Sequence, residues 1–141
     1  MIEVKNIKKV FGDKTIIEDV SSVMKAGQCN LIIGASGSGK TVLMKCMVGL
    51  FEPNEGEVLY SGESFTAMTG SDKTEIRKQI GMLFQGSALF DSQTVEQNVM
   101  FPLNMFTKDS YKEKLRRVNE VLERVNLVGA NKKFPSEVSG G

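Results

Sequence analysis

Gly34-Ala35-Ser36-Gly37-Ser38-Gly39-Lys40-Thr41 is the stretch of this 141-residue chain that decides the fold. It follows the apolar, partly β-branched run 29–33, which predicts a buried strand. It precedes the unbroken run 42–48, which predicts a helix packed on most of its faces. A strand, a glycine-rich turn, a Lys-Thr pair and a helix in this order are typical of a phosphate-binding P-loop.

Each residue type in this loop has a chemical reason to be there. The glycines permit positive φ angles and let successive N–H groups approach an anion, and the start of the helix adds its own unsatisfied N–H groups. Lys40 supplies a full positive charge for the β and γ phosphates, and the Thr41 hydroxyl is placed to ligate Mg²⁺. A merely structural glycine turn is the alternative, which the flanking strand and helix disfavour. The residues predicted to bind phosphate are Gly34, Ala35, Ser36, Gly37, Ser38, Gly39, Lys40 and Thr41.

The overall composition predicts a cytoplasmic protein with a core of its own. Eighteen basic and 17 acidic residues leave a net charge of +1, so the phosphate affinity must be local. The N-terminus does not resemble a signal peptide, and no apolar run is long enough to span a bilayer. Cys29 and Cys46 fall inside the predicted strand and helix, which favours buried free thiols over a disulfide or a metal site.

The period of the apolar residues and the turn residues between them predict the other elements. Residues 1–10 and 15–24 are expected to form two strands joined by a turn, as an antiparallel flap on the nucleotide core. Further elements are expected as strands at 57–60 and 80–84, a helix from Asp72 through residue 79, and a short helix opened by a Thr94–Gln97 capping box.

The segment from residue 111 predicts an amphipathic helix that ends near Val128-Gly129. Its charges at 112–114 and 116–117 are interpreted as a solvated face, in preference to a nucleic-acid contact. The apolar residues that recur at steps of four and three are Tyr111, Leu115, Val118, Leu122 and Val125.

Two apolar features leave alternatives open. Phe11, in the flap, is a candidate to stack on adenine, but it is also able to fill the core of the flap itself. Ala88-Leu89-Phe90 is apolar yet flanked by turn residues. This loop predicts either a partner surface or side chains that tuck inward.

Four landmarks in order carry a resemblance that covers the whole chain: Phe11-Gly12, the P-loop, Phe84-Gln85, and the terminal Pro-Ser-Glu-Val-Ser-Gly-Gly of residues 135–141. Together they resemble the nucleotide-binding domain of ATP-binding cassette (ABC) transporters. The resemblance implies an α/β fold: a P-loop NTPase core of ABC type with an N-terminal antiparallel β flap, a helical subdomain and an incomplete core sheet. It divides the chain into flap plus partial core at 1–94 and helical subdomain at 95–141.

The same resemblance assigns roles to individual residues. Phe11 looks like the residue that stacks on adenine, and Gln85 like the glutamine that contacts Mg²⁺ and the attacking water. Lys40 and Gln85 would then act in catalysis, Thr41 and Gln85 in metal binding, and ATP and Mg²⁺ would be the cofactors. The front of the family's signature motif, which meets the γ-phosphate held by a second subunit, is implied at Ser139, Gly140 and Gly141, with Val138 in place of the usual Leu.

The resemblance also implies partners and a place in the cell. The expected partners are a second copy of the subunit, in a head-to-tail dimer, and an integral-membrane permease docking on residues 86–101; no nucleic acid is expected. The subunit would be cytoplasmic and peripheral on the inner face of the membrane. The loop around Leu83 to Ser92 and the following residues 94–103 are similar to the Mla-type ATPases, which power phospholipid transport between bacterial membranes.

The chain departs from the family pattern at its end. No strand ending in Asp-Glu follows Gly141, and the chain contains no histidine, so neither the Walker B carboxylates nor a switch histidine is present. Because phosphoryl transfer depends on such positioned groups, we expect this chain to bind nucleotide without turnover, and a full-length parent to act as an ATPase. Unpaired strand edges in the core are further expected to cause self-association or partial order.

Three other functions compete with this interpretation. The first is the ATPase of another ABC importer or exporter. The second is a small P-loop kinase, whose arginine-rich lid would have to come from Arg116, Arg117 and Arg124 in an otherwise structural helix. The third is an ABC protein of DNA repair or translation, which the near-neutral charge disfavours.

Overall fold

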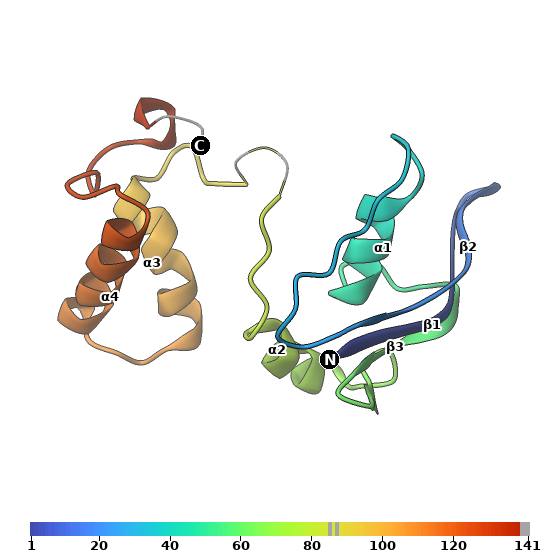
Figure 1. Cartoon of the computed structure of the whole chain (residues 1–141). Coiled ribbons are helices and arrows are strands. Elements are labelled where there is room, and N and C mark those ends of the chain that lie inside the picture. Colours follow the sequence, from blue (N-terminus) through green and yellow to red (C-terminus); the bar gives the residue numbers. More distant parts are fainter. Residues whose placement is uncertain (85, 87, 139–141) are drawn as a thin grey trace. The chain divides into compact units, whose positions relative to one another are not determined.

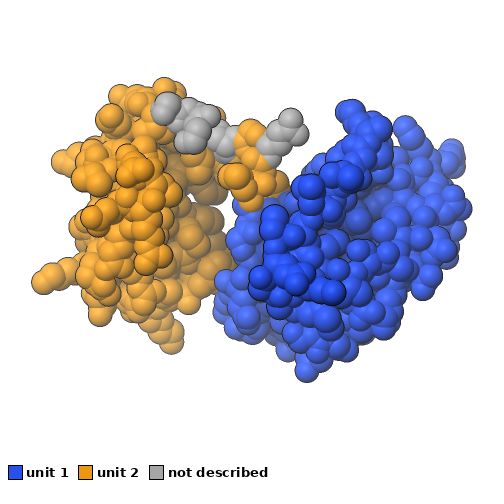
Figure 2. All heavy atoms as spheres, viewed as in Figure 1, with its two compact units in different colours: residues 1–82 blue, residues 83–141 orange. Residues whose placement is uncertain are grey.

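The structure is a computed structural model that describes residues 1–84, 86 and 88–138. The chain forms two compact units, residues 1–82 and residues 83–141, and each unit is described by itself (Figure 2). Unit 1 contains β1 (Ile2–Phe11), β2 (Lys14–Met24), α1 (Lys40–Met47), β3 (Glu55–Tyr60), β4 (Glu63–Ser64) and α2 (Gly70–Arg77). Unit 2 contains α3 (Val95–Phe106), α4 (Tyr111–Arg124) and the 3-10 turn η1 (Pro135–Glu137).

The strands of unit 1 form one antiparallel sheet in the order β2-β1-β3-β4 (Figure 1). Ile2 pairs with Met24 on one side and with Tyr60 on the other, which confirms the predicted antiparallel flap. The strand register shifts around Asn6, whose φ of 48° is left-handed and whose side chain donates to Asp19 Oδ1 at 2.7 Å. This irregularity explains how Val4 and Ile7, three residues apart, both face the core.

Helix α1 completes the core of unit 1. Leu43 and Met47 of this helix pack with buried side chains of the strands and with Phe65, which follows β4. Arg77 of α2 donates two hydrogen bonds to the chain just past α1. Its Nε donates to the Val48 carbonyl oxygen at 3.3 Å, and its Nη2 donates to the Gly49 carbonyl oxygen at 2.7 Å. Because these carbonyls lie at the C-terminal end of α1, a cation there also complements the helix dipole.

Two predicted strands are wrong in this structure. Residues 29–33 and 80–84 are not strands, and Leu31, Ile33 and Leu83 are 81%, 81% and 97% exposed. An apolar run becomes a strand only when a neighbouring strand accepts its hydrogen bonds, and neither run has such a neighbour among the described residues. For the same reason Cys29 is exposed where a buried thiol was predicted, whereas Cys46 is free and buried as expected. Burial raises the pKa of the Cys46 thiol.

Unit 2 is a pair of packed helices with its own small core. Val95 and Met100 of α3 meet Val118 and Leu122 of α4 in a buried cluster. The predicted capping box at the start of α3 is confirmed: the Gln97 N–H donates to Thr94 Oγ1 at 3.3 Å, and the Thr94 N–H donates to Gln97 Oε1 at 2.8 Å.

Three helix predictions need local corrections. Helix α2 starts at Gly70 rather than Asp72, because Thr69 accepts the Asp72 N–H and serves as its cap. Helix α4 ends at Arg124, earlier than Val128, because Asn126 adopts a left-handed φ of 57°. Tyr111, predicted on the apolar stripe, is exposed at the first position of α4, where its hydroxyl donates to Glu96 Oε1 at 2.8 Å.

Candidate functional site

The glycine-rich loop leads directly into α1. Gly39 is the residue before the helix, with a φ of 90°, and no side chain caps the first turn. The first turn also contains no acidic residue. The N–H groups and the positive end of the helix dipole are therefore available to an anion, as the motif predicts.

Two glycines of the loop have little space for a Cβ, and at Gly39 the positive φ favours glycine as well. A Cβ on Gly34 would lie 2.8 Å from Ser38 Oγ. A Cβ on Gly39 would lie 2.9 Å from the Ile16 carbonyl oxygen of β2. Gly37 has a positive φ of 77° but open space around it, so only its conformation favours glycine. Space for a side chain is therefore limited at Gly34 and Gly39, at the two ends of the loop, and unrestricted at Gly37 in its middle.

Lys40 folds back across the loop. Its Nζ donates to the carbonyl oxygens of Gly34 at 2.8 Å and Ala35 at 2.7 Å. The Ser38 N–H donates to the Ala35 carbonyl at 3.2 Å and closes the turn. A positive charge is therefore held at the mouth of the loop, close to the uncapped N–H groups, while Thr41 lies exposed on the first turn of α1. A phosphate entering this loop would meet both kinds of donor.

A groove of about 370 Å³ runs beside the loop. It is mostly apolar because β2 and the unpaired run before the loop supply most of its walls. Lys40, Ser38 and the carboxylate of Glu18 are its polar groups. The residues lining it are Ile16, Ile17, Glu18, Val20, Ile32, Ile33, Ser38, Gly39, Lys40 and Leu43.

Phe11 has features of both roles left open by its sequence position. Its ring packs edge-to-face on Phe51, with centroids 5.2 Å apart at 75°, yet it remains 43% exposed. Lys9 Nζ lies 5.0 Å from the centroid of the Phe11 ring and donates to the Glu52 carbonyl. The turn that carries Phe11 continues into the part of β2 that contacts Gly39. Phe51 was missed in the sequence, although an aromatic residue just after a helix end is a usable signal of packing.

The segment predicted to dock a permease is held by one amide that the sequence did not single out. Asn98 Oδ1 accepts the Phe90 N–H at 2.8 Å, and its Nδ2 donates to the carbonyls of Phe90, Gln93 and Thr94 at 3.0–3.1 Å. The Phe90 ring packs on Phe101 at 4.9 Å between centroids. Leu89 and Phe90 remain about half exposed, so this hydrogen-bonded segment still presents apolar surface.

Several predicted site residues fall outside the described residues: Gln85, Ser139, Gly140 and Gly141. In the described part of the chain, no group of three His, Cys, Asp or Glu side chains could hold a metal ion. Within the same residues, no helix is both long enough and apolar enough to cross a bilayer.

Comparison with known proteins gives a family match. A family model described as ABC transporter matches residues 17–141. The chain is 41% identical over 140 residues to the probable ribonucleotide transport ATP-binding protein mkl of Mycobacterium leprae, covering 99% of this chain and 40% of that protein. It is 44% identical over 147 residues to the methionine import ATP-binding protein MetN of Escherichia coli K12, and this match covers 100% of this chain and 42% of that protein. The chain thus spans about two fifths of the length of these relatives.

Solved structures give the same fold. The chain superposes with a TM-score of 0.87 and 29% identity on a dimeric post-hydrolysis state of the ATP-binding cassette MJ0796 bound to ADP and Pi. A second dimeric structure of MJ0796, described as a bacterial ABC transporter cassette, gives a TM-score of 0.88 and 30% identity. Each match covers 99% of this chain and 64% of that one. The predicted fold class, an ABC-type α/β cassette with an incomplete core sheet, is confirmed.

Proposed function

Because the chain belongs to the ABC transporter family, we propose that it is the ATP-binding portion of a transporter ATPase subunit. The observation that carries the proposal is the uncapped start of α1 beside the Lys40 ammonium, which together form one anion cradle. In a longer protein that also supplies hydrolytic carboxylates, this cradle would hold ATP for hydrolysis. The chain by itself would bind nucleotide without turnover.

The residues fit ATP and Mg²⁺. Lys40 would exchange its two carbonyl partners for phosphate oxygens, and Thr41 would offer its hydroxyl to Mg²⁺. The half-exposed ring of Phe11 would stack on the adenine. Gln85 is proposed as the second contact to Mg²⁺ and the attacking water. Ser139, Gly140 and Gly141 are proposed to reach the γ-phosphate held by a second copy.

The proposed assembly is a head-to-tail dimer on a membrane permease, at the cytoplasmic face of the membrane. The dimeric structures of MJ0796 support the dimer. The half-exposed Leu89 and Phe90, with the Phe90 backbone held by Asn98, support permease docking on residues 86–101. We divide the chain functionally into flap and core, 1–94, and helical subdomain, 95–141. The proposed cargo is phospholipid, because the loop around residue 86 resembles that of Mla-type ATPases. The relatives mkl and MetN are named for other cargoes, ribonucleotides and methionine.

Calorimetric titration of the chain with ATP and Mg²⁺ tests the cradle. Lys40→Met should weaken binding at least tenfold, because a charge-assisted contact to phosphate contributes about 1.5–3 kcal/mol. The matched control is Lys25→Met, which removes an exposed lysine from the same unit and should leave the affinity unchanged. Equal affinities of the Lys40→Met variant and the unmodified chain would refute the proposed cradle.

The cargo is tested on the transporter purified with its permease. Phospholipid in mixed micelles should stimulate ATP hydrolysis, whereas methionine and ribonucleosides should not. Stimulation by either of these two small molecules, with none by phospholipid, would replace the proposed cargo and leave the ATP-binding role intact.

A further inference from the structure

The positive charge of the chain is concentrated in ten residues. Residues 108–117 contain five Lys or Arg and two Asp or Glu. The other 131 residues contain 13 basic and 15 acidic side chains and are therefore slightly acidic. This basic stretch spans the connection between α3 and α4 and the first half of α4. We call residues 104–117 the α3–α4 corner.

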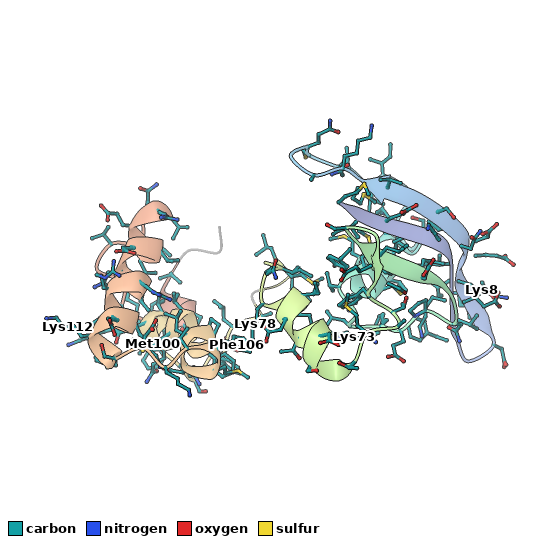
Figure 3. The ribbon with its side chains drawn as sticks, turned by 90° about the horizontal axis from the view of Figure 1, so that it is seen from below. Lys8, Lys73, Lys78, Met100, Phe106 and Lys112 are labelled. Carbon is teal, nitrogen blue, oxygen red and sulfur yellow. The ribbon has the colours of Figure 1, made fainter. Side chains whose placement is uncertain are left out.

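Bulky apolar side chains lie at the same corner. Met105 and Phe106, the last two residues of α3, are 60% and 49% exposed, and the ring of Tyr111 at the start of α4 is exposed as well. Figure 3 looks onto unit 2 from this side, with Phe106 and Lys112 labelled at opposite margins of the helix pair. The corner therefore carries exposed apolar side chains as well as exposed basic ones.

Internal contacts use some of these charges and leave others available. Arg117 pairs with Asp109 at 3.2 Å, and Arg116 pairs with Glu120. Lys114 donates to Asn104 Oδ1 at 3.0 Å. Lys108 and Lys112 are exposed and have no ion-pair partner within the described part of the chain.

The acidic side chains of the corner are engaged locally. Glu113 accepts hydrogen bonds from Ser110, which lower the pKa of its carboxyl. Asp109 pairs with Arg117. Glu113 keeps its negative charge, but Lys108, Lys112 and Lys114 outnumber it once the two arginine ion pairs are set aside. The net charge of the corner is therefore positive.

We propose that the α3–α4 corner binds the surface of an anionic lipid bilayer. Lys108 and Lys112 would contact lipid phosphates, and Met105 and Phe106 would enter the interface between headgroups and acyl chains. Basic groups combined with bulky apolar groups are the usual composition of such interfacial contacts. The proposal does not depend on nucleotide binding, because none of these residues belongs to the P-loop.

Two other macromolecular partners fit the corner less well. A nucleic acid would be recognised by the lysines, but it gives Met105 no apolar environment. A stable protein partner needs about 800 Å² on each side. The basic and apolar groups of the corner come from a single helix connection and its two flanking turns. A bilayer needs no such area because each inserted side chain and each basic group contributes separately.

Vesicle co-sedimentation of the 141-residue chain tests this proposal. We expect binding to vesicles of phosphatidylcholine with 30 mol% phosphatidylglycerol, weakened by 0.5 M NaCl and lost on pure phosphatidylcholine. The double variant Lys108→Glu, Lys112→Glu should reduce the partition coefficient at least tenfold, since each basic group near an anionic surface contributes about fivefold. Met105→Ser with Phe106→Ser should also reduce it.

A matched control separates this corner from general charge effects. Lys132→Glu with Lys133→Glu makes the same charge change at exposed positions of unit 2 outside the corner, and should bind as the unmodified chain does. Circular dichroism checks that every variant is folded. The proposal is wrong if the corner variants bind vesicles as well as the control does. It is also wrong if they lose binding to a DNA duplex or to an acidic protein while vesicle binding stays the same.

Discussion

At the scale of single residues, Gly39 carries the most demanding geometry of the loop. Its φ of 90° favours glycine, and the Ile16 carbonyl oxygen would lie only 2.9 Å from an added Cβ. The glycine-rich motif explains a glycine at this position by its positive φ. It did not predict the contact with β2, because that contact joins segments more than twenty residues apart.

Gly39→Ala should therefore lower the free energy of unfolding by more than Gly62→Ala. Gly62 has a nearly identical φ of 91° but open space around it, so its variant bears only the backbone strain of about 1–2 kcal/mol. The additional cost at Gly39 should be about 1–3 kcal/mol, because the carbonyl or the loop must move. Urea denaturation of the two variants measures the difference. Equal losses in the free energy of unfolding would mean that β2 moves away from the new Cβ at no energetic cost.

At the scale of elements, a helix or strand was predicted correctly when the interactions that form it are close in sequence. The Thr94–Gln97 capping box was predicted correctly because its atoms lie within one helical turn. Strand β1 was also predicted, since its partner β2 follows after a short turn. The runs 29–33 and 80–84 carry an equally clear apolar pattern, but their strand pairing depends on a distant neighbour. No local pattern reports whether that neighbour is present.

The start of α4 should make the stability of unit 2 depend on pH. Hydrogen bonds from Ser110 lower the pKa of the Glu113 carboxyl below its usual value of 4.5 in the folded chain. The folded state therefore binds this proton less tightly than the unfolded state does. The stabilisation is fully present above pH 4.5 and is lost as the pH falls through the lower, folded pKa.

Glu113→Gln should flatten this dependence while keeping the capping-box geometry. Thermal unfolding followed by circular dichroism between pH 3 and pH 6 is the measurement. Glu123→Gln is the control, since it removes a carboxylate of the same helix that does not cap its start. The idea fails if both variants keep the same slope of stability against pH as the unmodified chain.

At the scale of the whole molecule, exposed apolar side chains should drive self-association of the chain. Leu31, Ile33 and Leu83 are almost fully exposed, and their backbones have no strand partner in the described residues. Leu31→Lys with Ile33→Lys should shift sedimentation towards the monomer. Val128→Lys, at a position that is also exposed and apolar but lies in unit 2, should not. A single monomeric boundary for the unmodified chain at high concentration would contradict this expectation.

The order of the strands in the sheet has a consequence for folding during synthesis. All pairings of β2-β1-β3-β4 lie within the first 64 residues, and α1 lies between them. During synthesis from the N-terminus, all strands of the antiparallel sheet therefore leave the ribosome early. The apolar runs before the P-loop and after α2 have no strand to pair with at that stage. We expect those two runs to be the chaperone-binding segments of the nascent chain, with the flap already protected from amide hydrogen exchange.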